Sequence, residues 1–242
     1  MNIGVYQGAS ALESLERWQN LISQNIASSS IPGYKKTDMS FEGVAFGQLQ
    51  SGRGAAAQSA IMPVDDTKVS FETGYMSQTG NPTDFAIEGD GFFEVKDSVG
   101  NSLYTRDGEF HINTQNQLTT KNGSLVQGVG GAISLIPGGG DIAVDNGGQI
   151  YQGTQLVGRL KVVAFDDNSK LEKVNGGFLS GSASPKSATN SKIAQGYLEG
   201  SNVSAVDEMV NLIRVSRAQE ANQKTITAYD ERLGRVIQTF TR

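Results

Sequence analysis

The stretch Phe85-Ala-Ile-Glu-Gly-Asp-Gly-Phe-Phe-Glu-Val95 sets the pattern for the middle of the chain. Two short apolar runs, 85–88 and 92–95, flank Gly89-Asp90-Gly91. Glycine and aspartate tolerate the positive φ that a tight turn requires, so this pattern predicts two short β-strands with a sharp break between them. The middle of the chain is therefore expected to be built from strands.

Similar runs recur along the chain, and Asp107-Gly108, Asn122-Gly123 and Asn146-Gly147 lie at the breaks between them. The further strand candidates are 103–105, 109–112, 117–120, 142–144, 149–151 and 156–165. Many short strands need many sharp turns. This need explains why 30 of the 242 residues are glycine.

Helical periodicity marks both ends of the chain. Apolar or small residues repeat at 3,4 spacing near the start, which is typical of the narrow seam of a coiled-coil helix: Val5, Gly8, Leu12, Leu15, Gln19, Ile22 and Ile26. The same spacing returns in Leu212, Val215, Ile226, Tyr229, Leu233, Val236 and Phe240, with Met209, Val210 and Ile213 as a second stripe. Ser204-Ala-Val-Asp207 resembles a capping box, which places the start of this second helix.

These observations predict an α+β fold. We expect N- and C-terminal helices that form a coiled-coil-like inner domain, bracketing a mostly antiparallel β domain, with an extended linker arm. The predicted divisions are 1–47 (first helix and exit turn), 48–77 (arm), 78–194 (β domain) and 195–242 (second helix). Gly8, Gln19, Gln219 and Asn222 interrupt the seams, which favours contact with several partner helices.

The composition excludes several kinds of chemistry. There is no cysteine and one histidine, so disulfides, thiol nucleophiles and multi-histidine metal sites are ruled out. The net charge of −5 and the sparse cations Lys35, Lys36, Arg235 and Arg242, expected to be solvated surface charges, give no basis for nucleic-acid binding. We expect no enzyme activity, no metal and no cofactor.

Individual polar residues fit ordinary structural roles. His111 lies in an alternating strand pattern and is expected to face solvent. Glu88, Asp90 and Glu94 are expected to be hairpin-turn acids, because their spacing does not fit a calcium loop. No run of about 18 apolar residues occurs, and residues 1–30 do not resemble a secretory signal.

Four segments form recognisable motifs. They are Asn25-Ile-Ala-Ser-Ser-Ser-Ile-Pro-Gly-Tyr-Lys35, Thr79-Gly-Asn-Pro-Thr-Asp-Phe-Ala-Ile-Glu-Gly-Asp-Gly-Phe-Phe93, Tyr104-Thr-Arg-Asp-Gly-Glu-Phe110 and Gln195-Gly-Tyr-Leu-Glu-Gly-Ser-Asn-Val203. In this order they resemble the signatures of the bacterial flagellar rod and hook axial protein family. Ser29 and Ile31 depart from the residues that many relatives carry in the first motif.

The resemblance implies a structural subunit of the flagellar basal-body rod. Such a subunit polymerises through its terminal helices into the axial drive shaft that transmits torque from the motor to the hook and filament. The short length, Gly158-Arg-Leu-Lys161 and Leu198–Val203 favour a proximal-rod subunit. A distal-rod or hook-type subunit is the alternative.

The resemblance also implies where the protein acts and with what. We expect export without a cleaved signal peptide through the flagellar type III export apparatus, and a place in the rod within the periplasmic space. The expected partners are copies of the chain itself and other rod and hook axial proteins, with no nucleic acid and no membrane insertion. A peptidoglycan-interacting β domain on helical arms is a weaker alternative, with Asp84, Glu88, Asp90 and Trp18 as candidates.

Two groups of residues are expected to carry the function. The proposed assembly interface comprises Leu12, Leu15, Ile22, Ile26, Met209, Leu212, Ile213, Val215, Ile226, Leu233 and Val236, for which packing within one chain is the alternative role. The family signature positions are Asn25, Gly33, Tyr34, Asp84, Gly89, Gly91, Phe92, Arg106, Gly108, Ser201, Asn202 and Val203.

Overall fold

The computed structural model describes residues 3–46, 60–174, 178–181, 184–188 and 191–240. The chain divides into two compact units. We call them the helical unit (residues 1–27, 37–68 and 204–242) and the β unit (28–36 and 69–203). Each unit is assembled from segments that lie far apart in the sequence.

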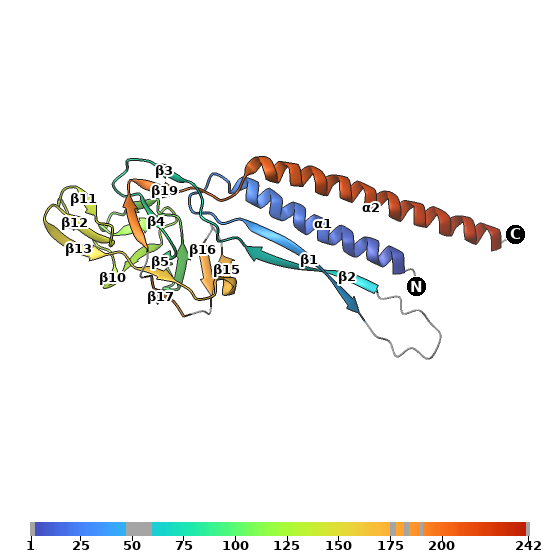
Figure 1. The fold of residues 1–242 in the computed structure, drawn as a ribbon, viewed down its shortest axis with the longest axis horizontal. Helices are drawn as coiled ribbons and strands as arrows, with labels where there is room; N and C mark the ends of the chain where they lie inside the picture. Colours follow the sequence, from blue (N-terminus) through green and yellow to red (C-terminus); the bar gives the residue numbers. More distant parts are fainter. Residues whose placement is uncertain (1–2, 47–59, 175–177, 182–183, 189–190, 241–242) are drawn as a thin grey trace. The chain divides into compact units, whose positions relative to one another are not determined.

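Two α-helices of the described residues, α1 (Ile3–Ala27) and α2 (Ala205–Phe240), lie side by side and antiparallel in the helical unit (Figure 1). The start of α2 confirms the predicted cap, because the backbone N–H of Asp207 donates to the Ser204 hydroxyl at 3.4 Å. The acidic side chains of Asp207 and Glu208 lie in the first turn, where the helix dipole favours negative charge.

The predicted coiled-coil-like inner domain with an extended arm is wrong. The helical unit also contains β1 (Thr37–Phe46) paired with β2 (Ala60–Val69), and α1 contacts β1 as well as α2. Asn25 on α1 makes two hydrogen bonds to the backbone of Thr37, accepting from its N–H at 3.2 Å and donating to its carbonyl at 2.9 Å. A helix that serves both a second helix and a strand is not one half of a coiled coil.

The predicted arm, residues 48–77, overlaps β2, whereas β1 falls in the division predicted as the first helix and its exit turn. Residues 60–69 form β2, whereas 47–59 lie outside the described residues. Pro63, Asp65 and Asp66 obscure the strand in the sequence because proline and aspartate are depleted in sheets. A proline is tolerated in β2 because a strand with one neighbour keeps an unpaired edge.

The β unit is built from antiparallel ladders, as the short runs predict. Its largest sheet has the order β15 (Leu171–Val174), β16 (Phe178–Gly181), β6 (Ser102–Thr105), β5 (Phe92–Lys96), β9 (Leu125–Gly128), β8 (Leu118–Thr120) and β7 (Phe110–Ile112). Off this path, β10 (Gly131–Ala132) pairs with β9, and β14 (Val162–Ala164) pairs with β5 and β17 (Lys186–Ser187).

Smaller ladders complete the unit. They are β11 (Ile142–Val144) with β12 (Gln149–Gln152) and β13 (Gln155–Arg159), β4 (Phe85–Glu88) with β18 (Lys192–Gln195), and β3 (Met76–Gln78) with β19 (Tyr197–Glu199). A short 3-10 helix, η1 (Asn168–Lys170), precedes β15. The strands predicted at 85–88 and 92–95 are confirmed, and the intervening Gly89 and Gly91 have φ of +99° and +130°.

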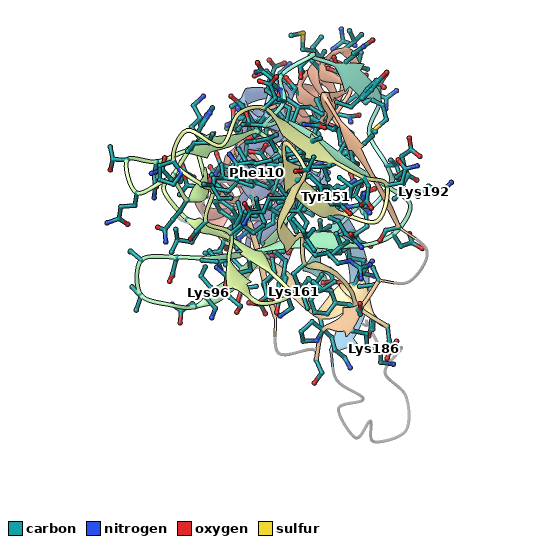
Figure 2. All side chains as sticks on the ribbon, turned by 90° about the vertical axis from the view of Figure 1, so that its left-hand side faces the viewer. Lys96, Phe110, Tyr151, Lys161, Lys186 and Lys192 are labelled. Atoms are coloured by element: carbon teal, nitrogen blue, oxygen red, sulfur yellow. The ribbon has the colours of Figure 1, made fainter. Side chains whose placement is uncertain are left out.

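Aromatic side chains fill the core of the β unit. Phe110 packs edge-to-face on Phe93, with ring centroids 5.3 Å apart, and lies 6.0 Å from Phe85. All three are fully buried, and Figure 2 shows Phe110 in the middle of the unit, with Lys96, Lys186 and Lys192 toward its rim. Edge-to-face ring pairs contribute stability beyond their buried area.

Gly108 lets two backbone segments meet beside this core. A Cβ atom at Gly108 would lie 1.7 Å from the carbonyl oxygen of Phe85, which no side-chain rotation can relieve. The Phe85 N–H donates to the Gly108 carbonyl at 3.1 Å, so this approach is also a hydrogen-bonded one. Backbone proximity therefore requires glycine at position 108.

We predict that Gly108→Ala destabilises the β unit by about 3 kcal/mol or more, because backbone atoms must separate to admit the methyl group. Chemical denaturation followed by circular dichroism measures the change. Gly158→Ala on β13 is the matched control, since a Cβ there meets open space. Equal stability of the two variants would contradict the close approach at Gly108.

Candidate functional site

The predicted assembly residues fall on two different faces of the helices. Ile22 and Val215 are fully buried, at 1% and 0% exposure. The half-buried members are Leu12, Leu15, Ile26, Leu212 and Ile226. The side chains of Leu233 and Val236 lie outside the described residues. The inner seam therefore packs, at least in part, within the chain.

Two residues that interrupt the predicted apolar seams, Gly8 and Asn222, contact each other between the two helices. Asn222 on α2 donates from its side-chain amide to the Gly8 carbonyl on α1 at 3.0 Å. A Cβ at Gly8 would lie 2.9 Å from Cγ1 of Ile226. The glycine thus allows the two helices to approach closely, as small residues do at helix interfaces, and the asparagine fixes their register.

The outer face of α2 carries apolar side chains that are exposed to solvent. They are Val206 at 70%, Met209 at 52%, Val210 at 43% and Ile213 at 55% exposure. Their i, i+3, i+4, i+7 spacing puts them on one stripe of the helix. We call these four residues the α2 outer stripe. An apolar stripe of this kind marks a surface suited to contact with another protein.

The signature motifs meet at one buried carboxylate in the β unit. Glu199 on β19 is fully buried, and its Oε1 accepts from Nζ of Lys35 at 2.7 Å. Its Oε2 accepts from a terminal nitrogen of Arg106 at 3.1 Å. We call these three residues the Glu199 cluster. Burial of such charges is favourable only when each is paired and hydrogen-bonded.

Backbone groups satisfy the rest of the cluster. The N–H of Gly74 donates to Oε1 of Glu199 at 3.0 Å, and Lys35 Nζ also donates to the Glu72 carbonyl at 2.6 Å. Arg106 donates to the carbonyls of Ile87 at 3.2 Å and Gly89 at 2.7 Å. Of these backbone groups, Ile87 lies in β4, whereas Glu72, Gly74 and Gly89 lie between strands and are held here by side-chain bonds.

The expectation that Lys35 is a solvated surface charge is wrong. Lys35 is 4% exposed, and burial lowers its pKa below the ordinary value, while the hydrogen bond and charge of Glu199 oppose this shift. Neither Lys35 nor Glu199 was among the predicted site residues. Both lie within the quoted motifs, but their pairing spans 164 positions and leaves no local signal.

Other signature positions hold the same region together. Asn202 accepts from the Lys36 N–H at 2.6 Å and donates to the carbonyls of Ser70 and Glu72 at 3.0 and 3.2 Å. The Ser201 hydroxyl accepts from the N–H of Val203 at 3.2 Å. These residues therefore fix the segment that precedes α2.

The glycine and aromatic signatures have packing roles. Gly33 has φ of +66°, and a Cβ there would lie 2.2 Å from backbone atoms of Arg106 and Asp107. A Cβ at Gly91 would lie 2.8 Å from Val162. The Phe92 ring lies under the Arg106 guanidinium at 5.4 Å, and the Tyr34 ring lies 3.8 Å from the Lys173 ammonium.

The acidic residues do not gather in a groove. Asp84 is buried and accepts from the Thr79 hydroxyl at 2.6 Å, whereas Glu88 and Asp90 are exposed. Glu94, expected in a turn, instead lies buried in β5, 2.7 Å from Lys161 Nζ. His111 is half exposed, as predicted. Among the described residues, no group of three or more potential ligands could hold a metal ion.

Burial also shifts the pKa values of Lys173 and Asp107. Burial lowers the pKa of Lys173 to about 8. Burial also raises the pKa of Asp107 to about 6, and the charges of Glu109 and Asp84 add to that rise. Asp107 accepts from the Glu109 N–H at 2.9 Å, which partly opposes the shift.

Replacing Glu199 tests the cluster. We predict that Glu199→Gln lowers the free energy of unfolding by about 3–5 kcal/mol, because Lys35 and Arg106 then remain buried without a counter-charge. Urea denaturation measures the loss. Asp166→Asn breaks the exposed pair with Lys186 and should cost no more than about 1 kcal/mol. A similarly small cost for Glu199→Gln would refute the role of the cluster.

Asp107 predicts a pH dependence of stability. Its pKa rises from 3.8 to about 6 on folding, so between these values the folded state binds more protons and stability falls as pH rises. Asp107→Asn should therefore be more stable than the parent at pH 7, by up to about 3 kcal/mol, with little gain near pH 4.

Asp97→Asn is the control of opposite sign. Hydrogen bonds from Asn101 lower the pKa of Asp97, so its ionised form favours folding above its unfolded pKa and this contribution is lost as pH falls. Urea denaturation across this pH range compares the variants. A stabilising effect of Asp97→Asn at pH 7, or none for Asp107→Asn, would count against these assignments.

Within the described residues, neither helix is long and apolar enough to span a membrane. Residues 86–152 match the family described as flagellar hook protein FlgE/F/G D1 domain, which covers much of the β unit. Residues 194–239 match the family described as flagellar basal body rod FlgEFG protein C-terminal. This second match includes Glu199 and the α2 outer stripe.

Curated relatives match the chain over nearly its whole length. A flagellar basal-body rod protein FlgF of Mesorhizobium japonicum is 34% identical over 91% of this chain and 90% of its own length. The FlgF of Caulobacter vibrioides is 34% identical over 93% and 92%, and a FlgG of Buchnera aphidicola is 33% identical over 88% and 90%. The chain therefore belongs to the family of flagellar basal-body rod proteins, the structural subunits of the rod in the flagellar basal body.

Proposed function

We propose that the chain assembles with copies of itself and with other flagellar axial proteins through the α2 outer stripe. The observation that carries this proposal is the division of α2 into two apolar faces. One face packs against α1, whereas Val206, Met209, Val210 and Ile213 are each at least 43% exposed. A subunit of a polymer needs such an unsatisfied surface.

Physical considerations support this use of the stripe. Fully burying an aliphatic side chain contributes about 1.5–3 kcal/mol, so four half-exposed side chains offer several kcal/mol to an interface. When the surface that covers the stripe lies elsewhere on the next subunit, the contact is heterologous and can repeat along a helix without closing. Repetition of one contact would produce an elongated shaft that transmits torque.

We propose that the chain acts through its surfaces and not as an enzyme. The absence of cysteine and the solvent-exposed position of its one histidine support this proposal. We also propose export through the flagellar type III apparatus, without a cleaved signal peptide, to the periplasmic part of the rod. The lack of disulfides suits a chain that must pass an export channel unfolded.

A finer question is whether the chain belongs to the proximal or the distal part of the rod. Similarity does not separate the alternatives, because relatives named FlgF and FlgG match at 34% and 33% identity. We propose the proximal part, on the length of the chain, on Gly158-Arg-Leu-Lys161 and on Leu198–Val203. Electron microscopy of basal bodies that carry a tagged chain would locate it, and label at the hook end would refute the proximal assignment.

A charge on the outer stripe tests the assembly surface. We predict that Ile213→Asp leaves the circular-dichroism spectrum and the unfolding transition of the β unit unchanged, while rod assembly and swimming are lost, because a carboxylate cannot enter an apolar interface unpaired. Isolated basal bodies and motility assays measure the outcome.

Ala218→Asp is the matched control, since it places the same charge at an exposed position of α2 outside the stripe. It should assemble normally. Normal rods in the Ile213→Asp strain would contradict the proposed surface, and loss of assembly in both strains would show that any added charge on α2 is disruptive.

A further inference from the structure

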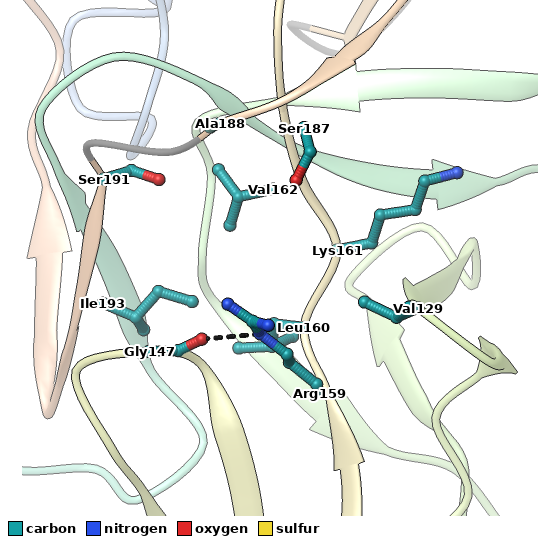
Figure 3. A pocket seen from close by; sticks show the side chains of 10 residues that line it. All are labelled: Val129, Gly147, Arg159, Leu160, Lys161, Val162, Ser187, Ala188, Ser191 and Ile193. Carbon is teal, nitrogen blue, oxygen red and sulfur yellow. Dashed lines mark hydrogen bonds between the residues drawn. The ribbon is translucent and has the colours of Figure 1, made fainter.

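A cavity of about 180 Å³ opens in the β unit. None of its lining residues belongs to the α2 outer stripe or to the Glu199 cluster. The cavity lies among the end of β13, the start of β14, β17 and β18 (Figure 3). Its lining residues are Val129, Gly147, Arg159, Leu160, Lys161, Val162, Ser187, Ala188, Ser191 and Ile193. Nothing in the proposed assembly function uses this space.

Three side-chain donors point into the cavity. Figure 3 shows the Arg159 guanidinium and the hydroxyls of Ser187 and Ser191 directed toward its middle, whereas the Lys161 ammonium points away. Arg159 is held in place by its Nε, which donates to the Gly147 carbonyl at 3.0 Å. Among the described residues, its terminal nitrogens and the two serine hydroxyls have no hydrogen-bond partner.

Arg159 is the cation that faces the cavity. Lys161 is paired with Glu94, 2.7 Å away. Asp145 is not among the lining residues, and its carboxylate accepts from the N–H groups of Gly147 and Gln149 at 2.9 and 2.8 Å. The backbone N–H groups of Lys161 and Ala188 are also bonded, to Gln127 and Val162. One guanidinium with two hydroxyls suits a monoanion that accepts several hydrogen bonds, and guanidinium matches carboxylate geometry well.

The remaining wall is apolar. Leu160 and Ile193 are buried at 3% and 4% exposure, and Val162 lies beside them. Such a wall suits an aliphatic group attached to the anion, which inorganic phosphate lacks. We propose that this cavity binds a small aliphatic carboxylate, such as the terminal residue of a peptide, with Arg159, Ser187 and Ser191 holding the carboxylate and Leu160, Val162 and Ile193 contacting its aliphatic part.

Titration of the full chain with N-acetylalanine, followed by backbone amide chemical shifts, tests the proposal. Saturable shifts are expected at Ser187, Ala188 and Ile193, with a dissociation constant on the order of 1 mM for so few contacts. The neutral N-acetylalanine amide should bind at least about tenfold more weakly, because it lacks the charge that Arg159 pairs with. No saturable shift, or equal binding of the amide, would overturn the proposal.

Variants and a second anion sharpen the test. Arg159→Gln should weaken binding at least about tenfold, whereas Lys96→Gln, which removes a charge from β5 outside the cavity, should leave it unchanged. The double variant Ser187→Ala/Ser191→Ala keeps Arg159 and should weaken binding severalfold. Unshifted signals of Phe110 and its neighbours establish that each variant is folded.

Inorganic phosphate serves as the competing ligand. It should bind more weakly than N-acetylalanine because it gains nothing from the apolar wall. Phosphate binding as tight as that of N-acetylalanine would overturn the assignment to an aliphatic carboxylate. Full binding by a folded Arg159→Gln variant would overturn the site itself.

Discussion

The buried carboxylate of Glu199 is the constraint on which the β unit depends. A carboxylate removed from water costs several kcal/mol unless cations and hydrogen-bond donors replace its hydration. Here Lys35, Arg106 and the Gly74 N–H supply them. The segments that carry these groups precede β1, follow β6 and precede β3, so none can leave its place without stranding a charge. The local structure of the connecting segments is therefore coupled to the fold of the whole unit.

Close approaches between backbone segments also determine the structure around the Glu199 cluster. Gly33 passes against the backbone of Arg106 and Asp107, and Gly108 passes against the carbonyl of Phe85. Both positions lie near a member of the Glu199 cluster in the chain. The glycines allow the segments to approach, and the ion pairs then hold them together. A methyl group at either glycine would act on the electrostatics of the cluster as well as on packing.

The helical unit divides its apolar surface between two purposes. Val215 and Ile22 are buried, and Asn222 of α2 bonds to the Gly8 carbonyl of α1. The outer stripe of α2 is left to solvent. Because members of this family build a rod, we propose that the stripe is covered by a neighbouring subunit, and its exposure is the observation that supports this proposal. The contact between α1 and β1 means that this surface belongs to a unit of helices and strands.

The sequence by itself determined the local elements. The apolar runs at 85–88 and 92–95 and the cap at Ser204 each depend on residues within a few positions, and the structure confirms them. The hairpin turn expected at Asp107-Gly108 is wrong, because β6 pairs with β5 and β16, whereas the next strand, β7, pairs with β8. The family motifs also identified Arg106, Gly33 and Asn202 as important positions without indicating what they contact.

Tertiary structure decided what pairs with what. The bonds of Glu199 join positions separated by 164 and 93 residues. Without knowledge of this partner, the sequence predicts that Lys35 is a surface charge. The pairing of β1 with β2 replaced an expected arm, because a strand that contains proline and aspartate is recognised only through its neighbour. The cavity around Arg159 likewise arises where several strands meet. Periodicity and turn chemistry are local properties and can be read from the sequence, whereas burial and charge pairing depend on the arrangement of distant segments.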